Sequence, residues 1–354
     1  MRHAPTTPEL VRRILKGERV SLARGISWVE NEAPGAAALL DACFRKSGRA
    51  RRLGITGPPG AGKSTLATRL AQEYRRRGHR VGIVAVDPTS PFSGGALLGD
   101  RVRMGELAGD EGVYIRSMAT RGGTGGLAVH TAQVCDVLDA AGFSRLLIET
   151  VGVGQSELEV AETADTTVVV LVPESGDGVQ AMKAGLMEIG DLFVINKADR
   201  EGAERASFAV RSALDLRERM GRNDGWQPPV LLTAASQGLG VAELADGLES
   251  HLAFLEERGA LEVGRRRRLE RRVSELVQGG LWAGFRAAIP EETWRETLDG
   301  VHARTLTPRQ AAERLAELSR SASSNGVRSR REVPVRADLP DARSRPARSR
   351  VARH

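Results

Sequence analysis

The fold is decided by the stretch Gly57-Pro58-Pro59-Gly60-Ala61-Gly62-Lys63-Ser64-Thr65. It follows a short apolar run at residues 53–56 and precedes a helical pattern at residues 66–74, the strand-loop-helix setting of G-x-x-x-x-G-K-[ST]. Glycines let backbone N–H groups approach an anion closely, and the helix N-terminus adds the positive end of its dipole. The stretch therefore predicts a loop for a nucleoside triphosphate. Lys63 is expected to reach the β- and γ-phosphates, and the Ser64 hydroxyl to bind Mg²⁺.

Composition points to a soluble, reduced, cytoplasmic protein. The 354 residues are 41% apolar and 27% charged, which is ordinary for a globular chain. The two cysteines form no CxxC or Cys/His pattern, so neither a disulfide framework nor a zinc site is expected. The first residues contain no apolar signal segment, and the apolar runs are too short to span a bilayer. No membrane partner is therefore expected.

The positive charge lies mainly at the C-terminus. Residues 322–354 hold nine arginines and three acidic residues of a chain whose net charge is +7. A Ser/Pro/Arg-rich tail of this kind is typically disordered. Because no aromatic residues are interleaved with the arginines, nucleic acid is not expected as a partner.

Carboxylates follow two predicted strands. Asp87 ends the apolar run at residues 81–86, and Asp100 lies in the glycine-rich loop that follows. Glu149 ends the run at residues 145–148, in Glu-x-x-Gly where most GTPases have Asp-x-x-Gly. The carboxyl ends of parallel strands line the ligand crevice, so Asp87 is placed to approach the metal or the attacking water, and a carboxylate at Glu149 can hold Mg²⁺ directly or through water. Asp87 and Asp100 are otherwise turn or cap residues.

Three further segments have the features of switches or anion-binding loops. The N–H of Gly152 is placed to sense the γ-phosphate, and Gln155 either orients the attacking water or is a plain surface residue. The glycine-rich loop around Arg121 is either an anion nest or a flexible loop. A third mobile segment is predicted at residues 173–185 and contains Lys183.

A guanine-reading motif follows the strand predicted at residues 191–195. It is Asn196-Lys197-Ala198-Asp199, in which the Asp199 carboxylate can accept from the N1–H and the 2-amino group of guanine. Lys197 is expected to pack over the base. Downstream, a backbone N–H of Thr233-Ala234-Ala235 is a candidate donor to guanine O6, although the commoner version has Ser in the middle. Together with the phosphate loop, this predicts GTP and GDP rather than ATP as the bound nucleotide.

The predicted fold is a P-loop NTPase of the α/β class, with a mostly parallel central sheet flanked by helices and helical extensions at both ends. Residues 8–45 read as helices that cover one edge of the sheet. Trp282, Phe285 and Trp294 gather in the C-terminal helical pattern and suggest a buried helix-helix contact within the protomer or across a dimer. The predicted parts are an N-terminal extension at 1–48, a GTP-binding domain at 49–252, a helical dimerisation region at 253–321 and a basic tail at 322–354.

These motifs in this order resemble the methylmalonyl-CoA mutase-associated GTPases, the MeaB/ArgK family of metallochaperone-type P-loop GTPases. The likeness covers about residues 8–320 and is carried by residues 57–65, 87–101, 121–126, 149–157, 176–183 and 196–199. It implies a homodimer linked by the C-terminal helices. It also implies GTP-dependent chaperoning of an adenosylcobalamin-dependent acyl-CoA mutase, with gating of cofactor loading and protection of the mutase. By position, the resemblance further implies that Asp87, Asp100 and Glu149 surround Mg²⁺. Lys183 is then part of a third switch, in which Glu174 replaces the usual glycine.

Three alternatives stay open. The first is a kinase of a periplasmic amino-acid transport system, a label that this family has also carried. The second is a nickel-insertion metallochaperone, against which the scattered histidines and two lone cysteines argue. The third is nucleic-acid binding through the tail. On the preferred reading, intrinsic hydrolysis of GTP to GDP and phosphate is slow, and a partner that orders the switches accelerates it.

Overall fold

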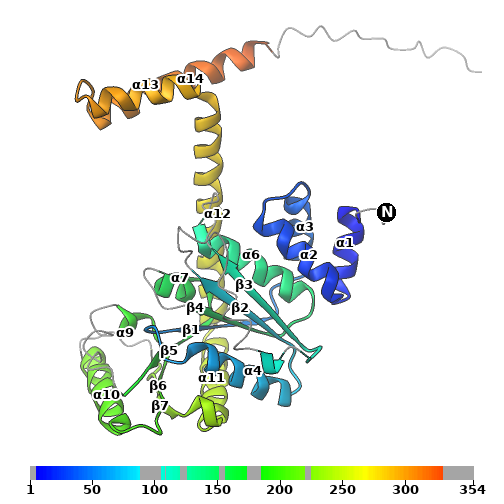
Figure 1. The fold of residues 1–354 in the computed structure, drawn as a ribbon, viewed down its shortest axis with the longest axis vertical. Coiled ribbons are helices and arrows are strands. Elements are labelled where there is room, and N and C mark those ends of the chain that lie inside the picture. Colours follow the sequence, from blue (N-terminus) through cyan, green and yellow to red (C-terminus); the bar gives the residue numbers. More distant parts are fainter. Residues whose placement is uncertain are drawn as a thin grey trace, which may run out of the picture. The chain divides into compact units, whose positions relative to one another are not determined.

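A computed structural model describes residues 5–87, 105–107, 109–119, 126–150, 156–173, 185–219 and 225–329 (Figure 1). The chain divides into two units, residues 1–279 and 280–354. The strands are β1 (Arg51–Thr56), β2 (Val81–Asp87), β3 (Val113–Ala119), β4 (Arg145–Thr150), β5 (Thr166–Leu171), β6 (Leu192–Asn196) and β7 (Val230–Thr233). The helices are α1 (Thr7–Leu15), α2 (Arg19–Glu30), α3 (Ala36–Phe44), α4 (Lys63–Arg76), α6 (Gly126–Ala140), α7 (Ser156–Thr163), α9 (Leu186–Ile189), α10 (Ala203–Arg219), α11 (Val241–Glu257), α12 (Ala260–Ala288), α13 (Glu291–His302) and α14 (Pro308–Ser329). Two short 3₁₀ turns, η1 (Gly105–Leu107) and η2 (Ala235–Gln237), complete the described elements.

The sheet has seven parallel strands in the order β3-β2-β4-β1-β5-β6-β7. Its central strands are continuous apolar runs, as expected of strands buried on both faces; every residue of β5 is buried. Leu53 of β1 pairs with Leu147 of β4 on one side and Thr166 of β5 on the other. All carboxyl ends therefore meet at one edge, and the predicted fold class is confirmed.

Helices cover both faces of the sheet. On one face, α4 and α11 pack on alternate side chains of β1, β2, β4, β5 and β6. On the other face, α6 and α7 cover one half of the sheet and α9 and α10 the other half. The core on the α4 and α11 face packs through fully buried aliphatic residues such as Leu70, Ile83 and Val170. Burial of each such side chain contributes roughly 1.5–3 kcal/mol relative to exposure.

The N-terminal helices α1, α2 and α3 pack on α6. Helix α2 also contacts β3, the edge strand: Arg19 Nη1 donates to the Val113 carbonyl at 2.6 Å, and Arg116 pairs with Glu30. These helices therefore cover one edge of the sheet, as their position in the sequence suggested.

The second unit contains the end of α12 with α13 and α14. Its aromatic residues form a cluster, in which the Trp282 ring lies 5.6 Å from that of Phe285 and 6.1 Å from that of Trp294. The side chain of Trp282 nevertheless stays 54% exposed. The helix contact thus exists within the protomer, but within this chain it is not buried as predicted, and it leaves apolar surface open. Among the described helices, none has the length and hydropathy needed to cross a membrane.

Candidate functional site

The phosphate loop connects β1 to α4 across the carboxyl edge of the sheet. Gly57 has φ 138°, and a Cβ there would lie 2.1 Å from the carbonyl oxygen of Val170 in β5. Gly62 caps the N-terminus of α4 at φ 88°. Only glycine fits these two positions, because a side chain would meet backbone at the first and adopt a left-handed conformation at both. The sequence motif thus produces a loop whose shape is set by contact with the neighbouring strand.

Lys63 is turned back over this loop. Its side chain is buried, and Nζ donates hydrogen bonds to the carbonyl oxygens of Gly57 at 2.7 Å and Pro58 at 2.9 Å. A buried ammonium needs acceptors of this kind. The contacts hold a positive charge at the mouth of the loop, where the sequence places the phosphates.

Asn196 joins three segments of the site. Its Nδ2 donates to the carbonyl of Ala61 in the phosphate loop at 2.8 Å. Its Oδ1 accepts from Thr233 Oγ1 at 3.0 Å and from the Ala235 N–H at 3.1 Å. The asparagine predicted to read guanine therefore braces the phosphate loop against the 233–235 segment, a role that the tetrapeptide alone did not reveal.

The base-reading segment is fixed by backbone contacts. Lys197 has φ 59°, unusual for a residue with a side chain, and the N–H of Ala198 donates to the Thr233 carbonyl at 2.9 Å. This geometry leaves Asp199 exposed at the turn after β6. Its carboxylate is thus accessible to a base lying beside the phosphate loop.

The predicted metal side of the site lies where β4 ends. Glu149 and Thr150 are each 2% exposed, and Glu149 is paired in register with Ile55 of β1 and Ala85 of β2. The buried hydroxyls of Thr56 and Thr150 have no hydrogen-bond partner among the described residues. Hydroxyl and carboxylate oxygens are what Mg²⁺ prefers, so this donor set fits the ion. Within the described ranges, no group of three or more His, Cys, Asp or Glu side chains forms a complete metal site.

Several predicted residues fall outside the described part of the chain. Asp87 closes β2 at the same edge, but its side chain is not described. The others that lie outside the described residues are Asp100, Arg121, Gly152, Gln155, Glu174 and Lys183.

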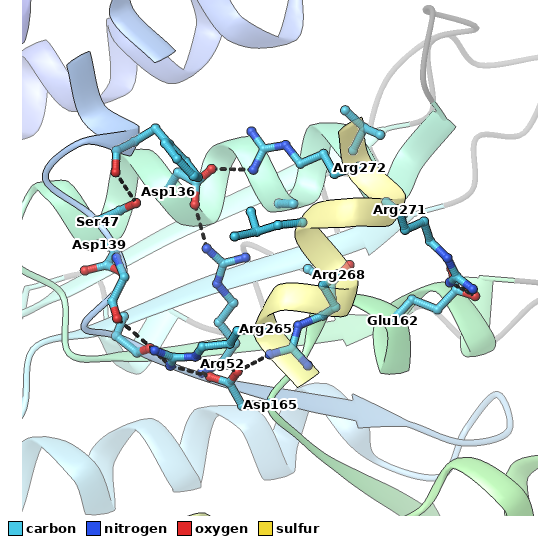
Figure 2. Close-up of a pocket in the computed structure, with 18 of the residues that line it drawn as sticks. Ser47, Arg52, Asp136, Asp139, Glu162, Asp165, Arg265, Arg268, Arg271 and Arg272 are labelled. Atoms are coloured by element: carbon cyan, nitrogen blue, oxygen red, sulfur yellow. Dashed lines mark hydrogen bonds and ion pairs between the residues drawn. The ribbon is translucent and has the colours of Figure 1, made fainter. Parts of the chain in front are cut away.

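A separate cavity of about 270 Å³ lies beside α12 and the start of β1, at the opposite edge of the sheet (Figure 2). Asp165 pairs there with Arg265 at 2.9 Å and with Arg268. Asp136 pairs with Arg52 at 2.7 Å and Arg272 at 2.5 Å. These contacts fasten the first turns of α12 to the rest of this unit. Sequence reasoning missed them because each pair joins distant residues without a local pattern.

The Asp165 carboxyl is strongly held in its charged form. Burial alone raises its pKa, but the hydrogen bond from Arg265 and the charges of Arg268 and Arg265 outweigh burial, so the pKa lies below its ordinary value. The arrangement is an anchor built from ion pairs, away from the nucleotide site.

The chain is similar to known proteins both in sequence and in structure. The family model described as "Methylmalonyl Co-A mutase-associated GTPase MeaB" matches residues 22–289. A Pyrococcus abyssi protein named as a GTPase is 48% identical over 305 residues, and the match covers 86% of this chain and 94% of the Pyrococcus protein. The mouse protein "Methylmalonic aciduria type A homolog, mitochondrial" is 35% identical over 330 residues, covering 87% and 78%. A crystal structure described as an LAO/AO transport system kinase has a TM-score of 0.65 and 32% identity, covering 90% of this chain and 98% of its own.

Proposed function

Since the chain belongs to the family of methylmalonyl-CoA mutase-associated GTPases, we propose that it is the GTP-hydrolysing chaperone of an adenosylcobalamin-dependent acyl-CoA mutase. In this role it gates cofactor loading and protects the mutase from inactivation. The assignment of nucleotide binding rests mainly on Asn196. Its hydrogen bonds connect the phosphate loop to the 233–235 segment, so the proposed phosphate and guanine sites lie next to each other. The mutase part is supported by the family description and by the name of the mouse relative.

In the proposed site, the phosphate loop at residues 57–65 binds the triphosphate and Lys63 neutralises its charge. Asp199 and Lys197 read guanine and hold the base. Mg²⁺ is proposed to bind through Ser64 and the carboxylates Asp87, Asp100 and Glu149, where it would stabilise negative charge on the phosphates. Gly152 is proposed to sense the γ-phosphate and Gln155 to orient the attacking water.

A homodimer through α12 is also proposed. Within the first unit, α12 exposes Val273, Leu276 and Val277, which are 59%, 47% and 54% exposed. Apolar residues at spacings of three and four lie on one helical face, a pattern typical of helix pairing. The wild-type chain is therefore expected to have twice the protomer mass in solution.

The function is tested by measuring GTP hydrolysis by the purified protein with and without a cobalamin-dependent acyl-CoA mutase. The proposal expects a slow intrinsic rate, below about 1 s⁻¹, that the mutase raises at least about tenfold. An unchanged rate, together with no co-elution of the two proteins with a GTP analogue bound, would contradict the chaperone role.

The alternative is a kinase of an amino-acid transport system, favoured by the description of the similar solved structure. Incubation with GTP labelled on the γ-phosphate separates the two proposals. A kinase leaves label on a protein, whereas the proposed GTPase releases all of it as inorganic phosphate.

A further inference from the structure

Arg69, on the second turn of α4, contacts the loop that follows β7. Its Nε donates to the carbonyl of Ala235 at 3.3 Å and its Nη2 to that of Ser236 at 3.4 Å. Both carbonyls belong to η2, which begins at Ala235, the last residue of the 233–235 segment assigned to guanine recognition. An arginine fork donates to the two carbonyls from two different nitrogens that are held in one rigid plane, a geometry that the single nitrogen of a lysine does not reproduce.

Holding these carbonyls sets the direction of the next N–H groups. The described chain has no cis peptide bond, so the N–H of Ser236 points away from the Ala235 carbonyl. The Ala235 N–H already donates to Asn196, and the Gln237 N–H donates to the Ala234 carbonyl at 2.9 Å. Among the described residues, no acceptor meets the Ser236 N–H. It is therefore the donor that the loop can offer to a ligand.

Glu106 also contacts the Arg69 guanidinium, through a different nitrogen from those that bind the carbonyls. Its Oε2 accepts from Arg69 Nη1 at 3.0 Å and from Gln72 Nε2 at 3.1 Å, and Gln72 Oε1 accepts from Arg69 Nη1 at 3.0 Å. Glu106 lies in η1, which is fixed to the core by the buried Leu107. This three-residue set fixes the guanidinium beside η2 and links η1 to it.

We propose that Arg69 is a positioning residue for guanine recognition. It donates hydrogen bonds to the Ala235 and Ser236 carbonyls and thereby orients the Ser236 N–H towards guanine O6. The role assigned to Arg69 rests on the guanine site of the proposed function. It differs from the sequence expectation, which placed the O6 donor within residues 233–235, because Asn196 uses the Ala235 N–H.

The test compares GDP with 6-thio-GDP, in which a weakly accepting sulfur replaces O6. Dissociation constants of both are measured by calorimetry on the full-length wild type and on Arg69→Met, which keeps the aliphatic stem. Arg69→Lys is the second variant, since it retains charge and packing but not the fork. Arg76→Met is the matched control, because Arg76 lies on the same helix and its side chain is 71% exposed, paired only with Glu73 among described residues.

The wild type is expected to bind GDP more tightly than 6-thio-GDP. In both Arg69 variants GDP affinity falls about tenfold, as expected for loss of the one hydrogen bond to O6, and the preference for GDP over 6-thio-GDP shrinks towards one. A Glu106→Gln variant shows a smaller change in the same direction, and Arg76→Met shows none.

Two results would overturn the proposal: an equal loss of affinity for both nucleotides in the Arg69 variants, which indicates a merely structural role, or no preference for GDP over 6-thio-GDP in the wild type. Failure of the proposed function has a different signature. In that case the wild type itself binds ADP as tightly as GDP, whereas failure of the Arg69 role alone leaves that wild-type selectivity intact.

Discussion

The side-chain amide of Asn196 donates to the carbonyl of Ala61 at 2.8 Å, across 135 residues of sequence. The same amide accepts from Thr233 and Ala235, so one buried side chain joins the loop proposed to bind phosphate to the segment proposed to bind guanine. Because Asn196 is 2% exposed, none of these polar groups has water as a ready substitute.

An Asn196→Asp variant keeps the two acceptor bonds and loses the donor to Ala61. The carboxylate then faces a carbonyl oxygen in a buried site, which costs about 2–3 kcal/mol of stability and loosens both loops. We expect GDP affinity to fall at least about tenfold. Urea unfolding and calorimetry with GDP measure the two effects, and a GDP affinity within twofold of wild type would contradict the bridge.

Gly57→Ala is expected to disrupt the phosphate loop. The added Cβ would lie 2.1 Å from the Val170 carbonyl oxygen, so β1 or β5 must shift, and nucleotide binding should be lost. Gly78→Ala, just after the C-terminal end of α4, is the matched control: it has φ 85° but no atom within 4 Å of the added Cβ. It should cost only about 1–2 kcal/mol for its left-handed backbone and keep binding. Equal behaviour of the two variants in GDP titrations would rule out the steric explanation.

Lys63→Ala removes the buried ammonium that lies over the loop. GTP affinity should fall by about 100-fold, since a charge-assisted contact to phosphate contributes roughly 2–3 kcal/mol. Lys46→Ala, at an exposed position, controls for the loss of a lysine. Titration with a fluorescent nucleotide measures the affinity of both variants. Wild-type affinity in Lys63→Ala would show that Lys63 does not contribute to nucleotide binding.

The lowered pKa of Asp165 predicts that the ion pairs between Asp165 and α12 contribute less stability at acidic pH. Its folded pKa is depressed, so the stability that it contributes is present above the unfolded pKa of about 3.9 and is lost as pH falls through the lower folded pKa. Asp165→Asn should cost about 3 kcal/mol at neutral pH because Arg265 and Arg268 lose their shared carboxylate. Urea midpoints between pH 3 and pH 7 should then show a smaller acid-dependent drop in the variant. An equal drop in both proteins would refute the prediction.

Val273→Glu combined with Val277→Glu should convert the proposed dimer to a monomer. Two charges on the exposed apolar face of α12 would have to be desolvated in a helix pair. Ser274→Glu places the same kind of charge at an adjacent, polar position and should leave the dimer intact. Light scattering coupled to size exclusion gives the masses, and a dimer in the double variant would locate the interface elsewhere.

The fold could be predicted from the sequence because the patterns that specify it are local. The glycine-lysine loop, the apolar runs and the residues that end them each depend on a few neighbours, and parallel strands follow from their order. The sequence also singled out Lys63 and Asn196 as candidate site residues, which stay predictions. It did not identify Arg69 as a contact of the guanine loop, because nothing near Arg69 in the chain distinguishes it from the other arginines of α4.

The sequence by itself determined that the loop at residues 57–65 and the loop at residues 196–199 follow strands of one sheet, since both motifs are short and each carries its own backbone geometry. Only the tertiary structure decided that Asn196 bridges those loops, that Arg69 grips one of them, and that Asp165 fastens α12. The reason is physical: these contacts join residues that strand order brings together, and a side chain's partner across 100 or more residues is set by where the strands lie, not by its neighbours in the chain.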